Sequence, residues 1–181
     1  GISPDIIAVA KGISSAYLPI AATVVKNSVF ESFLGEASEN RQVMQVNTYG
    51  GHPVSAAVAV RNIEIMEAEK LADRAAEMGA YLLDGLRTLT RHQVVGDVRG
   101  KGLLLAIELV KDRASKEPAG PAQIAAIVDF CRESGVLVGR SNGGRRYGGV
   151  ITMSPPLVVT RAECDRIVET LDRSLSTVKF D

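Results

Sequence analysis

Residues 4–12 have the sequence Pro-Asp-Ile-Ile-Ala-Val-Ala-Lys-Gly, a short apolar run that ends on a lysine and a glycine. A run of this length without polar alternation is typical of a strand that is buried on both faces of a sheet. A lysine at the mouth of such a strand is partly removed from water, which favours its neutral, nucleophilic amine. Lys11 is therefore a candidate for Schiff-base chemistry, although this pattern more often marks a lysine that ends a strand and reaches solvent.

The sequence that follows predicts one more strand and two helices. Ile20 to Val25 is a second strand-like run, and the Asn-Ser pair at residues 27–28 can start a short helix that ends near Leu34. Residues 35–47 are polar and indicate a surface loop. Pro53 suits the first position of a helix that runs to about Ala68, because proline lacks the N–H that a helix start leaves unpaired. We place a domain boundary between residues 70 and 71.

The rest of the chain predicts a smaller unit of alternating helices and strands. A helical stripe of apolar residues at spacings of three and four begins it: Leu71, Ala75, Met78, Leu82, Leu86 and Leu89. Strands are predicted at residues 94–98, 103–110, 136–138 and 150–154, and a helix at 121–134 that stops at Gly135. Thr160 and Glu163 form a capping-box pattern before the last helix. The fold class is α/β, with domains 1–70 and 71–181.

Composition excludes several classes of function. The 181 residues carry 21 basic and 21 acidic side chains, spread along the chain, so neither nucleic acid nor an anionic membrane is expected as a partner. No apolar run approaches the roughly 20 residues that cross a bilayer, and no signal-peptide pattern opens the sequence, so cytoplasm is the expected location. Cys131 and Cys164 have no CxxC or His/Cys cluster beside them. We interpret both as core thiols rather than metal ligands.

Four segments carry a resemblance to a known family. They are residues 4–12 with Tyr-Leu-Pro-Ile at 17–20, Asn-Thr-Tyr-Gly-Gly-His-Pro-Val-Ser-Ala-Ala at 47–57, Val-Arg-Gly-Lys-Gly-Leu at 98–103 with Ile-Glu-Leu at 107–109, and Ser-Pro-Pro-Leu at 154–157. In order and spacing they resemble the C-terminal part of the class III pyridoxal-phosphate (PLP) aminotransferases. The resemblance implies the fold of the fold-type I PLP-dependent transferases, with residues 1–70 from the end of the large-domain sheet and residues 71–181 as the small C-terminal α/β domain.

The same resemblance implies a cofactor, pyridoxal 5'-phosphate, and roles for two residues. Lys11 would hold the cofactor as a Schiff base, and its released amine would move a proton between the substrate's α carbon and the cofactor. Thr48 would reach across a homodimer interface to the cofactor phosphate of the partner subunit, so the two subunits would share the active site. Without the family, Thr48 would be interpreted as an ordinary loop threonine. Members often carry a His-Gly pair shortly before this threonine, whereas residues 45–47 here are Gln-Val-Asn, so the loop's contacts are expected to differ.

Arg99, His52 and His92 are expected to have structural rather than catalytic roles. In the resembled family the Arg-Gly-x-Gly segment around Arg99 is mainly a turn of the small domain. His52 directly precedes Pro53, which favours a turn or helix-start role over acid–base work. His92 is interpreted as a surface residue.

An arginine is the usual partner of a substrate α-carboxylate, because its planar fork pairs with both oxygens. In the acetylornithine-type and ornithine-type branches it stands three residues before the Pro-Pro pair, where this chain has Thr152. In the ω-amino-acid and amine:pyruvate branch it lies about ten residues before that pair on a mobile loop, which maps to Arg145. A gap in the count would place Arg146 or Arg140 at this position instead of Arg145. A solvated basic loop without a role in binding accounts for these arginines equally well. The favoured reaction is transfer of an amino group from an amine or ω-amino acid to an oxo acid such as pyruvate.

Two alternatives stay open on the sequence. Another fold-type I PLP enzyme, such as an aminomutase or a dialkylglycine-type decarboxylase, would share the lysine and threonine segments. A non-catalytic assembly domain would use Lys11 only as a strand end. The resembled chains are more than twice as long, and their acidic partner of the pyridine nitrogen, stacking aromatic and Gly-Ser phosphate contact have no counterpart here. This chain alone is therefore expected to be inactive or nearly so, and its first two strands to expose apolar faces.

Overall fold

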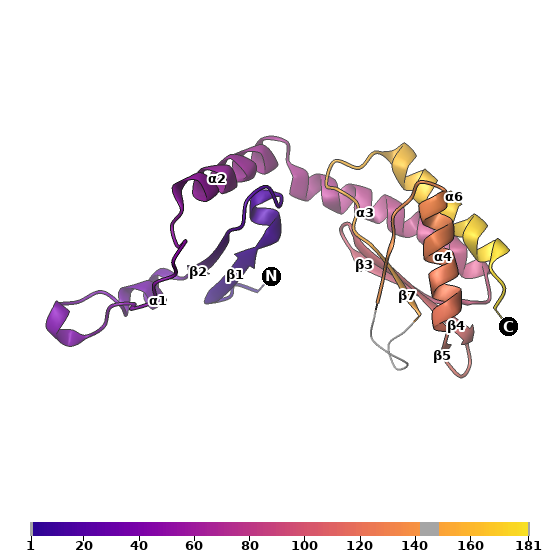
Figure 1. Cartoon of the computed structure of the whole chain (residues 1–181), viewed down its shortest axis with the longest axis horizontal. Coiled ribbons are helices and arrows are strands. Elements are labelled where there is room, and N and C mark those ends of the chain that lie inside the picture. The colour runs from indigo at the N-terminus through magenta and orange to yellow at the C-terminus, as the bar shows by residue number, and fades with distance from the viewer. Residues whose placement is uncertain (1, 142–148, 181) are drawn as a thin grey trace. The chain divides into compact units, whose positions relative to one another are not determined.

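A computed structural model describes residues 2–141 and 149–180 of the chain. They form two compact units, residues 1–69 and residues 70–181, each with its own sheet (Figure 1). The structural boundary lies one residue before the position at which the sequence places it. The assignment of the two units to a large and a small domain stays a prediction.

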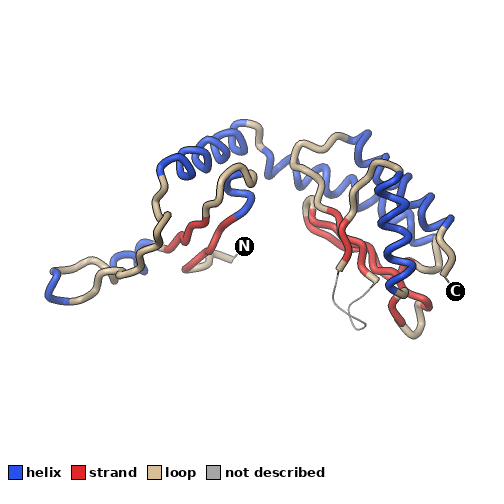
Figure 2. Tube along the Cα trace, viewed as in Figure 1, coloured by secondary structure: helices blue, strands red, loops and turns tan. Residues whose placement is uncertain are grey.

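The first unit is a two-stranded hairpin beside one long helix (Figure 2). Its strands pair antiparallel, from Ile6 opposite Val25 to Ala10 opposite Ala21. The loop at residues 35–47 contains one short 3-10 helix, and the helix predicted at 27–34 is shorter than expected. The elements are β1 (Ile6–Ala10), η1 (Lys11–Ser14), β2 (Ala21–Val25), α1 (Asn27–Glu31), η2 (Ala37–Glu39) and α2 (Pro53–Ala68).

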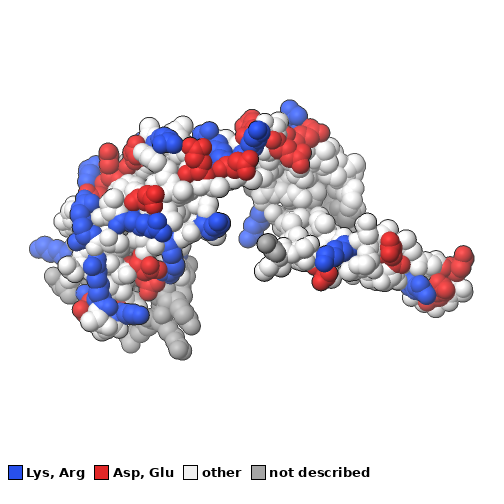
Figure 3. Space-filling model, turned by 180° about the vertical axis from the view of Figure 1, so that it is seen from behind, with Lys and Arg blue, Asp and Glu red and all other residues white. Residues whose placement is uncertain are grey.

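The hairpin differs from the buried strand that its apolar sequence predicts. Ile6 is 58% exposed and Val24 is 55% exposed, because β1 pairs with one strand only and the described residues of this unit add no further layer over the hairpin. Sixteen of the 19 large hydrophobic residues that are exposed in the described part of the chain belong to residues 2–65. Charged side chains are also sparser here, with eleven of the 42 in residues 1–69 (Figure 3). The surface of this unit has the apolar character of an interface.

The second unit is a sheet with helices packed against it. The strand order is β3-β4-β7-β6, all neighbours are antiparallel, and β5 extends the edge of β4. Helices α3 and α4 pack on the sheet, and α6 contacts both helices (Figure 1). The elements are α3 (Leu71–Arg87), η3 (Thr88–Arg91), β3 (Val95–Lys101), β4 (Leu104–Asp112), β5 (Glu117–Pro118), α4 (Pro121–Glu133), β6 (Gly139–Arg140), β7 (Val150–Met153) and α6 (Arg161–Thr177).

The core of the second unit follows the predicted periodicity. The stripe on α3 and η3 is buried at Met78, Leu82, Leu86 and Leu89, where it meets the alternating inward residues of β4. Cys131 and Cys164 are fully buried in this cluster, so their interpretation as core thiols is confirmed. Burial raises the pKa of both thiols. No group of three metal-ligating side chains occurs in the part of the chain that the structure describes.

Helix ends form where local sequence signals place them. Thr160 accepts a hydrogen bond from the Glu163 amide, and the Glu163 carboxylate accepts one from the Thr160 amide at 2.7 Å, which completes the predicted capping box of α6. Helix α4 ends at Glu133, and Gly135 shortly after it has a φ of +78°, the left-handed conformation of a glycine that follows a helix. The amide of Val136 donates to the Cys131 carbonyl at 2.8 Å, which closes this stop.

Two expectations about strands and turns of the second unit are wrong. Residues 136–138 do not form a strand; the pairing with β7 begins only at Gly139, and Leu137 is 84% exposed, because the helix stop redirects the chain first. Arg99 lies within β3 rather than in a turn, and the turn is made by residues 102–103. Arg99 pairs with Asp97 and Glu108, both at 2.7 Å. These hydrogen bonds raise the pKa of Arg99, and the bond to Asp97 has the larger effect. Its expected structural role fits these contacts.

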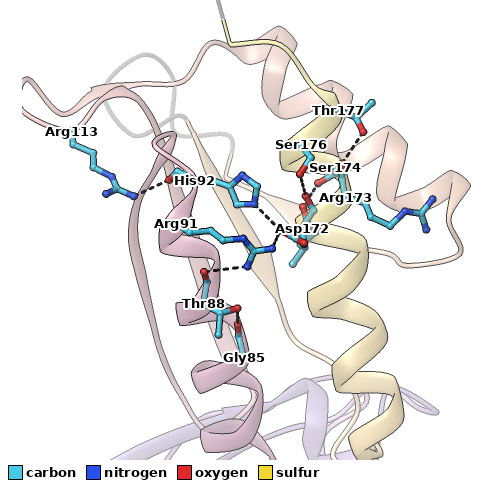
Figure 4. A network of polar contacts seen from close by, with 11 residues as sticks. Gly85, Thr88, Arg91, His92, Arg113, Asp172, Arg173, Ser174, Ser176 and Thr177 are labelled. Atoms are coloured by element: carbon cyan, nitrogen blue, oxygen red, sulfur yellow. Dashed lines mark hydrogen bonds and ion pairs between the residues drawn. The ribbon is translucent and has the colours of Figure 1, made fainter.

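His92 is half-buried rather than a free surface residue (Figure 4). Its Nε2 lies 2.6 Å from the Asp172 carboxylate on α6, and Arg91 pairs with the same carboxylate at 2.5 Å. The hydrogen bond from His92 lowers the pKa of Asp172, although partial burial opposes the shift. Arg113 donates to the backbone carbonyls of Thr90 and His92. The network thus ties η3 to α6 and to the segment after β4.

No helix within residues 2–141 and 149–180 is both long and apolar enough to cross a lipid bilayer.

Candidate active site

The first unit contains a cavity of about 1020 Å³ between two segments that are distant in sequence. Residues 10–21 supply one wall and residues 47–56 the other. Lys11 and Thr48, the two residues that the sequence nominates as cofactor ligands, both line it. The hairpin and the start of α2 therefore bring them into one site, and the cavity belongs entirely to the unit with the apolar surface.

Lys11 stands where β1 passes into η1, in an unusual backbone conformation. Its φ is +53°, and Ser15 and Ala16 follow with φ of +47° and +62°. Each non-glycine residue in this left-handed region costs about 1–2 kcal/mol. Such residues gather at functional sites, where the surrounding structure holds them in place. Three within six positions mark this turn as a site, and nothing in the types of these residues predicts it.

The turn is also fixed from within. Ser14 is only 1% exposed, and its hydroxyl donates to the Leu18 carbonyl at 2.7 Å. The amides of Ser15 and Tyr17 donate to the carbonyls of Gly12 and Ser14, at 3.2 and 3.1 Å. The Lys11 side chain itself is exposed. The desolvation that the sequence led us to expect at Lys11 is thus not provided by these residues, because the strand that carries it is uncovered.

Thr48 lies on the opposite wall, in a turn that leads into α2. The Gly50 amide donates to the Asn47 carbonyl at 2.9 Å, and Gly51 has a φ of +69°. His52 then accepts a hydrogen bond from the Ser55 amide at its Nδ1, at 3.4 Å. His52 is therefore the cap of α2, as its position before the proline predicts. The first residues of this 16-residue helix, including Ser55 and Ala56, line the same cavity.

The chemistry of the cavity suits an anionic ligand with a carbonyl carbon. Among the described residues that line it there is no carboxylate, and Lys11 supplies a cationic nitrogen. The amino end of α2 contributes the positive end of its helix dipole, which favours a phosphate. Thr48 adds a hydroxyl donor. These groups fit the phosphate and the aldehyde of PLP.

The arginine expected to recognise a substrate carboxylate is not placed. Arg145 and its alternative Arg146 lie outside the described residues. The other alternative, Arg140, is an exposed residue of β6 in the second unit. Thr152 is half-buried on β7 and lines a second cavity of about 400 Å³, together with residues 154–156.

Comparisons with known proteins agree with this chemistry. The family described as Aminotransferase class-III matches residues 1–175. An uncharacterized aminotransferase of Bacillus subtilis is 47% identical, and the taurine–pyruvate aminotransferase of Bilophila wadsworthia is 41% identical; the match covers 98% of this chain and 40% of either relative. The chain thus spans about two-fifths of the length of these relatives.

Solved structures of similar chains have the same fold. A Bacillus anthracis aminotransferase superposes with a TM-score of 0.90 at 44% identity, over 97% of this chain and 39% of its own. An amine transaminase from an uncultivated Pseudomonas species, solved in its PLP-bound form, superposes with a TM-score of 0.88 at 38% identity, over 98% and 39%. The α/β fold is therefore that of the corresponding part of PLP-dependent transaminases. Because the family model matches residues 1–175, nearly the whole length, the chain belongs to the class III aminotransferase family.

Proposed function

We propose that the protein to which this chain belongs is a PLP-dependent ω-transaminase that moves an amino group from an amine or ω-amino acid to an oxo acid such as pyruvate. The observation that carries the proposal is the strained turn that places Lys11 in the wall of the cavity. The names of relatives support the substrate class, since several are taurine–pyruvate aminotransferases.

Each residue of the cavity has a distinct task in this proposal. When bound, PLP supplies a conjugated ring that accepts the electrons of the substrate's α carbon. Lys11 attaches the cofactor covalently through Nζ and, once released, holds and transfers the α proton. Thr48, with the amino end of α2 beside it, donates its hydroxyl to a phosphate oxygen of the cofactor held by the partner subunit. The acidic partner of the pyridine nitrogen must come from outside these residues.

Reduction with borohydride tests the attachment directly. The full-length protein, with PLP bound, should yield a pyridoxyl-labelled peptide that contains Lys11, and the Lys11→Ala variant should lose this label and the visible absorbance of the bound cofactor. A label found on a different lysine would contradict the assignment. Absence of any cofactor would favour the assembly-domain alternative.

The amino acceptor separates transamination from the other PLP reactions. A transaminase needs one equivalent of oxo acid for each amine converted, whereas an aminomutase turns over without one. A dialkylglycine-type decarboxylase would release carbon dioxide from its amino-acid substrate. Product analysis with and without pyruvate therefore distinguishes the three reactions.

We further propose that the protein is a homodimer in which Thr48 binds the cofactor phosphate of the partner subunit. The exposed apolar surface of residues 2–65 supports burial against a partner or the rest of the polypeptide. Co-expression of Lys11→Ala chains with Thr48→Ala chains tests the sharing. If Thr48 acts on the partner's cofactor, each mixed dimer has one intact site and regains activity; if it acts within its own chain, no site is intact and activity is not regained.

Arg145 is proposed to bind the substrate carboxylate. Arg145→Ala in the full-length protein should raise KM for carboxylate-bearing substrates and leave simple amines nearly unaffected. Arg146→Ala and Arg140→Ala are matched controls on the same basic segment. An equal loss for both kinds of substrate would remove this role. The cytoplasmic location stays an expectation from the sequence.

A further inference from the structure

We infer that Asn62 is a positioning residue for Lys11, acting through the backbone of the turn at residues 11–19, hereafter the lysine turn. The inference rests on the proposed function, in which Lys11 carries the cofactor. Asn62 lies on α2, about fifty residues further along the chain, and its side chain is half-buried where α2 packs against η1. It does not line the cavity.

The Asn62 amide makes three hydrogen bonds to the lysine turn. Its Nδ2 donates to the carbonyl oxygens of Gly12 at 3.0 Å and Ile13 at 3.1 Å. Its Oδ1 accepts from the Ser15 hydroxyl at 2.6 Å. The carbonyl of Gly12 belongs to the residue directly after Lys11, and Ser15 is one of the residues with positive φ. One side chain thus holds the backbone directly after Lys11 and also the side chain of Ser15.

Only a primary amide meets this requirement. The two backbone carbonyls need N–H donors, and the hydroxyl of Ser15 needs an acceptor; asparagine has two donors on one atom and an acceptor on the other. This pattern also fixes the orientation of the amide, since the reverse placement would set Oδ1 against two carbonyl oxygens. An aspartate of the same shape would repel those oxygens, and an alanine would leave them without these donors.

Hydrogen bonding, rather than steric confinement, holds the lysine turn at Gly12. A methyl group at Gly12 would meet no atom within 4 Å, so the surroundings leave the glycine free to change conformation. The hydrogen bond from Ser14 to Leu18 secures the far part of the turn, but it does not reach Gly12. Without Asn62, the left-handed conformation of Lys11 loses the contacts next to it, and the direction of its side chain becomes variable.

The experiment uses full-length protein carrying Asn62→Ala, Asn62→Asp or Ser15→Ala. Arg61→Ala is the matched control, because Arg61 is the preceding residue of α2 and its exposed side chain pairs only with Glu64, at 3.0 Å, among the contacts described. Hydrogen exchange of peptides from residues 11–19 is measured first, on protein without PLP. Both Asn62 variants should exchange about tenfold faster there, as expected for the loss of two hydrogen bonds. Ser15→Ala should have a smaller effect, and Arg61→Ala none.

Cofactor spectroscopy provides the second measurement. With PLP bound, the pH titration of the visible band of the Lys11-linked cofactor should shift in both Asn62 variants and stay unchanged in Arg61→Ala. Circular dichroism checks that each variant is folded; if Asn62→Asp does not fold, Asn62→Ala and Ser15→Ala carry the test. Unchanged exchange and an unchanged titration in folded Asn62→Ala would overturn the inference. Failure of the proposed function is seen separately, as absence of a pyridoxyl label on Lys11 in the wild type.

Discussion

Replacement of Gly79 by alanine tests the closest backbone contact in the second unit. Gly79 lies in the middle of α3, and a Cβ atom there would come within 2.1 Å of the Gly102 carbonyl oxygen and 2.2 Å of its carbonyl carbon. Gly102 itself turns the chain between β3 and β4 with a φ of +53°. The obstacle is backbone, so no side chain can rotate away. The helix and the turn would have to separate by about 1.3 Å to reach an ordinary contact of 3.4 Å.

Two effects of opposite sign decide the result. Alanine is a better helix former than glycine by about 1 kcal/mol. Overpacking of a well-filled core costs about 1–3 kcal/mol, and more when the backbone must move. Because the added Cβ atom overlaps with the backbone of Gly102, we expect the cost of overpacking to exceed the gain in helix propensity. Gly79→Ala should lower the free energy of unfolding by about 2 kcal/mol or more.

Gly85 provides a matched control on the same helix. A Cβ atom there would meet Cγ2 of Val168 at 3.0 Å, which is a side-chain atom that can give way. Gly85→Ala should therefore change the stability by less than about 1 kcal/mol in either direction. The two variants receive the same gain in helix propensity, so the difference between them isolates the contact with Gly102.

Urea unfolding of residues 70–181, followed by circular dichroism, measures both variants. This segment holds the whole buried cluster described for the chain, so it is expected to fold by itself. The midpoint should fall for Gly79→Ala without a change in the slope. A Gly79→Ala variant as stable as wild type, or no less stable than Gly85→Ala, would refute the reasoning.

Three further predictions concern the same segment. Asp172→Asn should lose the pH dependence of stability that arises from the lowered pKa of Asp172 beside His92. The stability that the wild type gains from this carboxylate is complete above about pH 5 and declines as the pH falls through the lowered pKa. The urea midpoints of the two proteins should therefore converge in acid. Thr160→Ala should lower the stability by about 1 kcal/mol in thermal unfolding, because it removes the cap of α6, and an unchanged Tm would show that the cap is dispensable. Cys131 and Cys164, both fully buried, should react with iodoacetamide only at the rate of opening of the fold; rapid labelling under native conditions would contradict their core position.

Local signals predicted several helix boundaries in both units. The helix from Leu71, the proline start of α2 and the capping box of α6 depend on residues within one or two turns, and the structure has all three. The prediction of a strand at residues 136–138 was wrong. Strand propensity describes each residue by itself and takes no account of the helix stop at Gly135 directly before them. The prediction that His92 is a surface residue was wrong for a different reason. Its partner Asp172 is eighty positions away, so nothing beside it in the sequence indicates burial.

The site residues stay predictions of the sequence, and the sequence did not indicate the backbone conformation at Lys11. Lys11 and Thr48 carry motifs, and the fold places them in one cavity. The left-handed backbone at Lys11 could not be predicted, because lysine has no preference for it, and Asn62 carries no signal of its own in an ordinary helix. The expected desolvation of Lys11 depends on layers that would cover β1, and the described residues of the first unit do not provide them.

The contrast between the two units explains why the site is arranged in this way. Residues 70–181 bury a large cluster and contain their own supports, whereas in residues 1–69 one apolar side chain, Ala59, and two serines are buried among those described. A strained turn costs free energy that its surroundings must offset, and here the offset comes from directed hydrogen bonds by Ser14 and Asn62 rather than from packing. Directed bonds keep their geometry in an open unit, so the lysine turn can be formed before the cofactor and the covering layers arrive. In the proposed function, PLP would then bind to a turn that already has this shape, and its binding free energy would stabilise the turn further.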